Sequence, residues 1–391
     1  MKSLLKHQMS RLLIVASLAV LIPASSFAAV AISITIAPPV MPVYVQPACP
    51  GDGYMWTPGY WSWGDAGYYW VPGVWVMAPQ PGLLWTPGYW GFGGGAYLWH
   101  AGYWGPHVGF YGGVNYGFGY SGVGFIGGIW AGNVFRYNTA VVNVNTTVVR
   151  NVYVDRTVIH NTTIVNRASF NGTGGIMARP NAGEMSAMNE RHVQATSTQI
   201  SHQSLAGRDH NQLASVNHGT PGTAAMDSVN GRRFNQQGRI ANGVSSGQLT
   251  AGETHNLESR EANINHEVRA DRQANGGTLT PQERQKVNQQ QNNVSHSIYA
   301  DKHNTNTATY GNNEVGARRD NQQQRIAQGV GIGTMTAGQA AKVEGKEQQI
   351  NHQVGADRQA NGGKLTQSEH QQVNKEQNAA SKQIHTDKHG K

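Results

Sequence analysis

Hydrophobic and polar residues alternate strongly in the segment AVVNVNTTVV. Val142 and Val144 fall on one side of the alternation, and Asn143 and Asn145 fall on the other. A period of two residues is typical of a β-strand with one polar face. The sequence therefore predicts β-strands within residues 106–170, a stretch that is first Gly-rich and then rich in Val and Asn.

The C-terminal part of the chain follows a helical spacing instead. Leu257, Ile264 and Val268 are separated by seven and then four residues, which matches a narrow apolar seam along one side of a helix. Polar stretches around Gly247 and Gly276 interrupt this pattern. The order predicted is helix, loop, helix, loop, helix.

This helical pattern occurs twice, with a period of 86 residues. Residues 232–303 match residues 318–389 at 41 of 72 positions. The sequence therefore predicts a duplication, with copy 1 over residues 230–304, a linker over residues 305–317 and copy 2 over residues 318–391. The apolar seam is thin, so each copy is expected to have a marginal core.

Residues 171–229 consist mainly of Ser, Thr, Asn, Gly and His with scattered apolar side chains. Such a segment buries too little apolar surface to offset its ordering entropy, so a disordered linker is predicted. Residues 29–52 are expected to form a Pro-rich extended segment. The expected fold is mixed and segregated: a Gly- and aromatic-rich antiparallel β N-terminal region, a disordered linker and an α-helical C-terminal duplication.

A unit W-x-x-G-x-W occurs four times within residues 53–105, and its first tryptophans are 14, 15 and 14 residues apart. Turn signals separate the units: GDAG, APQPG and GFGGG. Four strands of about ten residues in a β meander are predicted. The units are Trp56–Trp61, Trp70–Trp75, Trp85–Trp90 and Trp99–Trp104.

The Pro-Gly pair inside the first three units needs its own explanation. Two tryptophans five residues apart would point to opposite faces of a regular strand. A bulge or kink at Pro-Gly would bring both rings to one face, with glycine supplying an unusual backbone angle. A hairpin turn at Pro-Gly is less favourable, because a type II turn matches the twist of paired strands poorly.

These units resemble the YXWGXW (WxxGxW) repeats of bacterial cell-envelope proteins. WTPGYW, WVPGVW and WTPGYW are close matches, and WHAGYW is a looser one. The resemblance covers roughly residues 50–105 of the 391. It implies an exported bacterial protein, and it implies no activity, because the family has no established biochemical function.

Two hypotheses compete for the tryptophans of the units. They form either a small aromatic core or an exposed platform on which sugar rings stack. Contact with a membrane surface and self-association are further alternatives. The candidate glycan-stacking residues are Trp56, Trp61, Trp70, Trp75, Trp85, Trp90, Trp99 and Trp104.

The N-terminus carries an export pattern. Basic residues including Lys2 and Arg11 precede the apolar run LLIVASLAVLIPA, and Ala28 ends a stretch of small residues. A secretory signal peptide is predicted for residues 1–28, with an uncleaved anchor as the alternative. Export would place the protein in the periplasm, on the outer membrane or outside the cell. No transmembrane helix is expected after signal cleavage.

Removing this segment lowers the formal charge from +8 to +5. An excess of this size suits weak attraction to anionic envelope polymers. It does not indicate a nucleic-acid partner, because the basic residues form no concentrated stripe. The expected partners are envelope polymers or another envelope protein.

The loops of the duplication resemble calcium loops at first. NGVSSGQLTAGE places Asn242 and Glu253 at the first and last EF-hand positions. The second copy, however, ends its loop in Gln339. A capping box accepts either Glu or Gln, so helix capping by Thr250 and Thr336 explains these residues better.

Other site chemistry is weak in this sequence. The sixteen histidines are scattered along the chain and the single cysteine assists no metal, so no dedicated metal site is predicted. Gly117-x-Gly119-x-x-Gly122 lacks a following helix pattern. No catalytic residue, metal or cofactor is predicted. We expect an exported non-enzymatic envelope protein with a structural or adhesive role. A glycan-binding module is the alternative, and weak EF-hand-like calcium binding is the second alternative.

Overall fold

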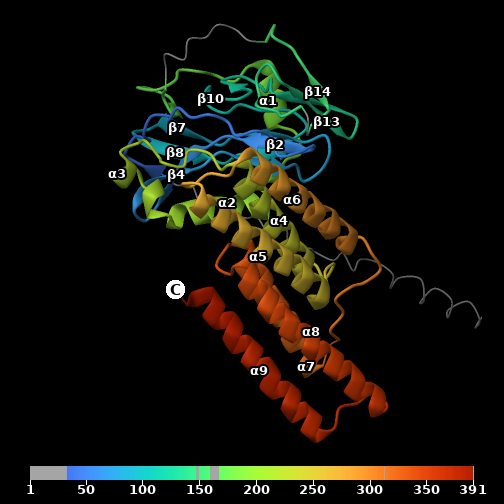
Figure 1. Ribbon diagram of the computed structural model, residues 1–391. Helices are drawn as coiled ribbons and strands as arrows, with labels where there is room; N and C mark the ends of the chain where they lie inside the picture. Colours follow the sequence, from blue (N-terminus) through green and yellow to red (C-terminus); the bar gives the residue numbers. More distant parts are fainter. Residues whose placement is uncertain (1–32, 147–148, 159–166, 312, 391) are drawn as a thin grey trace, which may run out of the picture.

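The computed structural model describes residues 33–146, 149–158, 167–311 and 313–390. An antiparallel β region precedes a helical region (Figure 1), which confirms the segregated fold predicted from sequence. The predicted signal peptide, residues 1–28, lies outside the described residues.

The first two repeat units form one antiparallel hairpin that is broken once in each arm. Strands β3 and β4 pair next to the turn, and β2 and β5 pair farther out. Trp61 lies opposite Trp70, and Trp56 lies opposite Trp75. The strands are β2 (Tyr54–Thr57), β3 (Tyr60–Gly64), β4 (Gly67–Val71) and β5 (Val74–Met77).

The last two units repeat this arrangement in a second hairpin. Here Trp90 lies opposite Trp99, and Trp85 lies opposite Trp104. The hairpins contact each other through side chains, and Trp90 Nε1 donates to the Trp61 carbonyl at 2.8 Å. The predicted single meander is therefore wrong, because the units pair two by two. The strands are β6 (Leu84–Thr86), β7 (Tyr89–Gly93), β8 (Ala96–His100) and β9 (Tyr103–Gly105).

Short strands complete the β region. Strand β1 pairs with β8, β10 with β11, β13 with β12 and β14, β15 with β7, and β16 with β9. Their bounds are β1 (Ser33–Ile34), β10 (Asn115–Gly117), β11 (Tyr120–Ser121), β12 (Gly128–Ala131), β13 (Val134–Asn138), β14 (Val152–Tyr153), β15 (Phe170–Asn171) and β16 (Val193–Gln194).

The alternating Val and Asn stretch forms less strand than its pattern predicts. Val142 and Val149 are buried in the aromatic core. Asn143 binds the neighbouring Pro-rich segment, because its backbone N–H donates to Gln46 Oε1 and its carbonyl accepts from the Cys49 N–H. The polar face therefore binds another segment of the chain instead of facing water along a regular strand.

The described part of the Pro-rich segment, residues 33–52, runs largely without regular secondary structure, and the β region supplies hydrogen bonds to it. Trp61 Nε1 donates to the Val40 carbonyl at 3.1 Å, and Trp75 Nε1 donates to the Pro47 carbonyl at 2.8 Å. Indole N–H groups thus satisfy carbonyls that have no strand partner.

The predicted disordered linker, residues 171–229, is instead ordered against the hairpins. Trp70 Nε1 donates to the Ala224 carbonyl at 2.9 Å, and His202 Nε2 lies 2.7 Å from the Pro72 carbonyl. The composition argument failed because this segment caps its own helices and covers aromatic surface that it does not itself supply. Its helices are α1 (Ala182–Met188), α2 (Ser197–Arg208), η1 (His210–Gln212) and α3 (Ala214–Asn217).

The duplication folds as predicted, with three helices in each copy. Each second and third helix begins at a threonine that forms a capping box with the Glu or Gln three residues later. This confirms the capping interpretation of the loops. Copy 1 contains α4 (Ser228–Ser245), α5 (Ala251–Ala274) and α6 (Pro281–Lys302), and copy 2 contains α7 (Glu314–Gly331), α8 (Ala337–Ala360) and α9 (Gln367–His389).

Candidate functional site

The glycine of each repeat unit makes room for a tryptophan of the paired unit. A Cβ on Gly59 would lie 2.3 Å from Trp70 Cζ2, and a Cβ on Gly73 would lie 2.4 Å from Trp56 Cζ2. Real Cβ atoms do not approach this closely, so the first tryptophan of one unit fits only over a glycine of the other.

The second hairpin uses the same reciprocal fit. A Cβ on Gly88 would lie 2.5 Å from Trp99 Cζ2, and a Cβ on Gly102 would lie 2.5 Å from Trp85 Cζ2. None of the four repeat glycines has a positive φ. The predicted unusual backbone angle is therefore wrong, and these glycines are required for space.

Seven of the eight candidate stacking tryptophans are buried, and Trp99 alone is half-buried. The seven belong to one aromatic core that also contains Tyr111, Tyr120 and Tyr137. This geometry favours the core hypothesis over an exposed eight-ring platform. Trp99 and Trp85 remain candidates, because both line a cavity.

This aromatic cavity lies where the breaks of the two hairpins meet. It holds about 80 Å³ of space for water-sized molecules. Pro58 and Pro72 contribute from one hairpin, and Gly88 and Gly102 contribute from the other. The Pro-Gly breaks therefore open the strand pairing at one level and leave a hollow between the hairpins.

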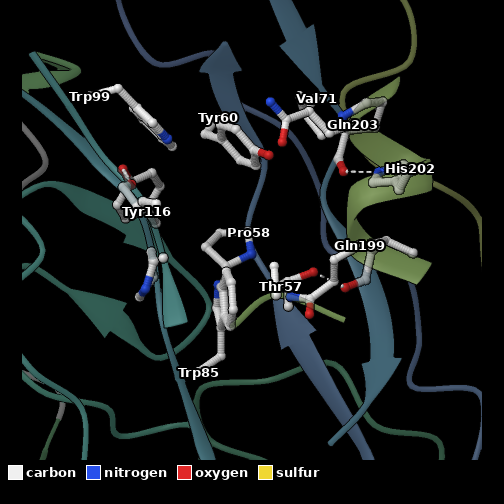
Figure 2. A pocket seen from close by; sticks show the side chains of 17 residues that line it. Thr57, Pro58, Tyr60, Val71, Trp85, Trp99, Tyr116, Gln199, His202 and Gln203 are labelled. Carbon is white, nitrogen blue, oxygen red and sulfur yellow. Dashed lines mark hydrogen bonds between the residues drawn. The ribbon is translucent and has the colours of Figure 1, made fainter. Parts of the chain in front are cut away.

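Figure 2 shows the walls of the aromatic cavity. Tyr60 and Trp99 are stacked, with their ring centroids 5.2 Å apart and their planes at 19°. Trp85 lies near Pro58 on another side, and Tyr116 lies toward a third. These rings give the cavity a mainly apolar lining.

Helix α2 supplies the polar groups of the cavity (Figure 2). Gln199 Oε1 accepts from Trp104 Nε1 at 2.8 Å, so the Gln199 amide nitrogen stays available to a ligand. Gln203 Nε2 donates to Ser62 Oγ at 3.0 Å, so the Gln203 amide oxygen stays available. Burial lowers the pKa of His202, although its bond to the Pro72 carbonyl acts in the opposite direction.

A neutral imidazole, two amides and aromatic walls suit a small uncharged ligand with both an apolar face and hydrogen-bonding groups. Sequence reasoning identified Trp85 and Trp99 but missed Tyr60, Gln199 and Gln203. A tyrosine precedes the second tryptophan in three of the four units, and that recurrence was the available signal. The glutamines lie in the segment predicted to be disordered.

The described residues offer neither a metal-binding cluster nor a membrane-spanning helix. Within the described ranges, no three His, Cys, Asp or Glu side chains are grouped so that they could hold a metal ion. The Glu253 carboxylate accepts hydrogen bonds from the Thr250 N–H and from Asn304 and Asn306. The carboxylate of the calcium-like loop is therefore bonded to groups of the protein. No described helix has both the length and the apolar character needed to cross a bilayer.

Comparison with known families finds two copies of the WXXGXW repeat, over residues 51–76 and 81–104. Each copy coincides with one hairpin and contains two W-x-x-G-x-W units. No curated protein and no solved structure matches the chain. The paired tryptophans and their facing glycines are thus how the repeats pack in this chain, which contains two WXXGXW repeats.

Proposed function

We propose that this is an exported, non-enzymatic protein of the bacterial cell envelope that acts by contact, in a structural or adhesive role. The observation that carries the proposal is the position of copy 2. Helices α7, α8 and α9 lie at the end of the molecule away from the β region (Figure 1). The β region and copy 1 would hold this arm, and its polar outer faces would meet a partner.

The joint between the β region and copy 1 supports this role. Asn235 Nδ2, on α4, donates to the Trp75 carbonyl at 2.7 Å. Helix α4 also packs against β5, and α2 packs against both α4 and β4. A load applied to the arm would pass through these contacts into the aromatic core.

The experiment that tests the proposal is fractionation of cells that make the full chain. We expect the mature protein to lack the predicted signal peptide, residues 1–28, and to be found outside the cytoplasm. Purified cell-wall sacculi or another envelope component should retain it. A full-length chain that stays in the cytoplasm and binds no envelope fraction would contradict the proposal.

A second candidate function is binding of one sugar ring of an envelope glycan in the aromatic cavity. It is favoured by Trp99, the half-buried member of the tryptophan set, which stacks with Tyr60 at the cavity wall. The Gln199 amide nitrogen and the Gln203 amide oxygen would bind hydroxyl or acetamido groups. Aromatic faces and planar amides are a common combination for sugar recognition.

For this candidate, Trp99→Ala should weaken binding of soluble peptidoglycan fragments by at least about tenfold, because the ring supplies much of the contact area. Isothermal titration calorimetry of the mature chain measures the effect. Trp63→Ala is the matched control, since Trp63 is also half-buried but does not line the cavity. Equal losses in both variants, or no saturable binding by the wild type, would contradict sugar binding at this site.

A further inference from the structure

The two helical copies pack on each other with near two-fold symmetry. Helix α5 contacts its equivalent α8, and α4 contacts its equivalent α7 (Figure 1). A Cβ on Gly252 would lie 2.9 Å from Gln348, and a Cβ on Gly338 would lie 3.8 Å from Ala262. Since Gly252 corresponds to Gly338 and Ala262 to Gln348, the two contacts are equivalent, and the copies use the same face.

Four buried glutamates lie on the two helices that form this face, and we name them the glutamate quartet. They are Glu258 and Glu261 on α5 and their equivalents Glu344 and Glu347 on α8, and none is more than 1% exposed. The positions are two pairs related by the 86-residue period. Carboxylates are almost never buried to this extent unless they are paired or protonated.

Few hydrogen bonds compensate for this burial. Gln237 Nε2 donates to Glu258 Oε2, and Gln323 Nε2 donates to Glu344 Oε2, each at 2.9 Å. Among the described residues, the other oxygen of each of these carboxyls has no hydrogen-bond partner, and Glu261 has none at either oxygen.

Among the described residues, nearby arginines oppose the rise in pKa at Glu261 and Glu347. Arg233 on α4 and Arg260 on α5 act on Glu261, and Arg319 on α7 acts on Glu347. No ion pair between the quartet and these arginines is formed within the described residues.

His255 and Tyr310 also lie near the quartet. His255 on α5 lies with its Nδ1 2.7 Å from the Ala341 carbonyl on α8. The Tyr310 ring stacks under Arg319, with the guanidinium carbon 4.6 Å from its centroid. Within the described residues, neither side chain forms an ion pair or a hydrogen bond with a carboxyl of the quartet.

We propose that the α5–α8 face is a proton-controlled contact, which holds the two copies together while the glutamate quartet is protonated and releases copy 2 when the quartet ionises. The interface is built from equivalent faces, so ionisation places like charges on both of its sides. A charge on Glu258, in copy 1, raises the pKa of Glu344 in copy 2.

The direction of the pH effect follows from the burial of the carboxyls. Burial raises the pKa of Glu258 and of Glu261 to about 8 and that of Glu347 to about 7, and it raises the pKa of Glu344 well above its usual range. The carboxyls therefore bind protons more tightly when the two copies are in contact than when they are apart. The contact is most stable below pH 4.5, the ordinary value for glutamate, and loses stability up to about pH 8.

Small-angle X-ray scattering of the mature chain, at about pH 5 and about pH 8.5, tests the proposal. We expect the radius of gyration to be larger at the higher pH, with the open-to-closed ratio at least about tenfold greater. Glu258→Gln combined with Glu344→Gln keeps the shape of the protonated side chains without their charge. This variant should remain closed at both pH values.

Two matched variants complete the experiment. Glu267→Gln, also on α5 but outside the quartet, should behave like the wild type. Ala262→Cys combined with Gly338→Cys places two sulfurs across the interface, because the 3.8 Å Cβ separation suits a disulfide. Once oxidised, it should stay closed at either pH and thus define the closed scattering curve.

Either of two results would overturn the proposal. One is wild-type scattering that matches the disulfide-locked variant at both pH values. The other is an unchanged pH response after Glu258→Gln with Glu344→Gln, since the histidines of the chain would then be responsible. If that double variant fails to fold, the single variant Glu261→Gln replaces it, with its folding checked by circular dichroism. It must reduce the change in radius of gyration between the two pH values.

Discussion

Gly73→Ala is expected to destabilise the β region by about 3 kcal/mol, near the upper end of the cost of overfilling a packed core. The added methyl would lie 2.4 Å from Trp56 Cζ2 and 3.1 Å from the Gly59 backbone nitrogen. Trp56 is 1% exposed and packs edge-on against Trp75, so its ring has little room to move. Urea unfolding followed by tryptophan fluorescence measures the loss.

Gly93→Ala is the matched control for this change. Gly93 also lies in a repeat strand, lacks a positive φ and would place its methyl in open space. We expect its free energy of unfolding to stay within about 0.5 kcal/mol of the wild type. A double-mutant cycle with Trp56→Phe should show coupling, because the smaller ring relieves the contact. Equal effects of Gly73→Ala and Gly93→Ala would contradict the spatial role of the repeat glycine.

The reciprocal fit of tryptophan and glycine was predicted from the sequence only in part. The spacing predicted strands, a break at Pro-Gly and clustered tryptophan rings, and all three are present. It did not predict that Gly73 faces Trp56, which belongs to the preceding unit. A spacing within one unit carries no information about which unit lies opposite, so the glycine was assigned to backbone geometry instead of to a cross-strand contact.

The segment containing Gln199 and Ala224 shows a second limit. Its composition alone predicts disorder, because it supplies little apolar surface of its own. Trp70 and Trp104 each donate an indole hydrogen bond to it, so the stabilising surface belongs to the hairpins. An argument from composition considers only the apolar surface that a segment itself can bury. It omits the apolar surface of the neighbouring segment on which it packs.

The glutamate quartet shows a third limit. A glutamate in a helical pattern is expected to face solvent. Neither Glu258 nor Glu344 lies within an apolar seam, so the pattern did not predict their burial. The sequence did contain a signal for these positions. Glu258 and Glu261 are both retained in copy 2, whereas the neighbouring Thr254, Asn256 and Ser259 are replaced there. Repetition within one chain thus pointed to a position under constraint, although not to its burial.

Trp70→Ala should have the largest effect of any single change, about 3–5 kcal/mol of unfolding free energy. Trp70 is 0% exposed, packs against Trp61 with ring centroids 5.2 Å apart and fills the space above Gly59. Its loss also removes the hydrogen bond to the Ala224 carbonyl. Residues 214–228 should therefore become accessible to protease before the rest of the chain does, which mass spectrometry of early cleavage products would show.

Two variants separate the ring of Trp70 from its N–H group. Trp70→Phe keeps an aromatic ring but removes one of the two donors to the Ala224 carbonyl, which also accepts from the Gly73 N–H at 3.0 Å. It should therefore cost only about 1 kcal/mol and expose the protease site less than Trp70→Ala does. Trp63→Ala removes a half-buried ring from the same hairpin and should cost less than half as much as Trp70→Ala, without new cleavage. Early cleavage near Ala224 in the wild type would show that this segment is not held by Trp70, because the indole bond would then be too weak to order it.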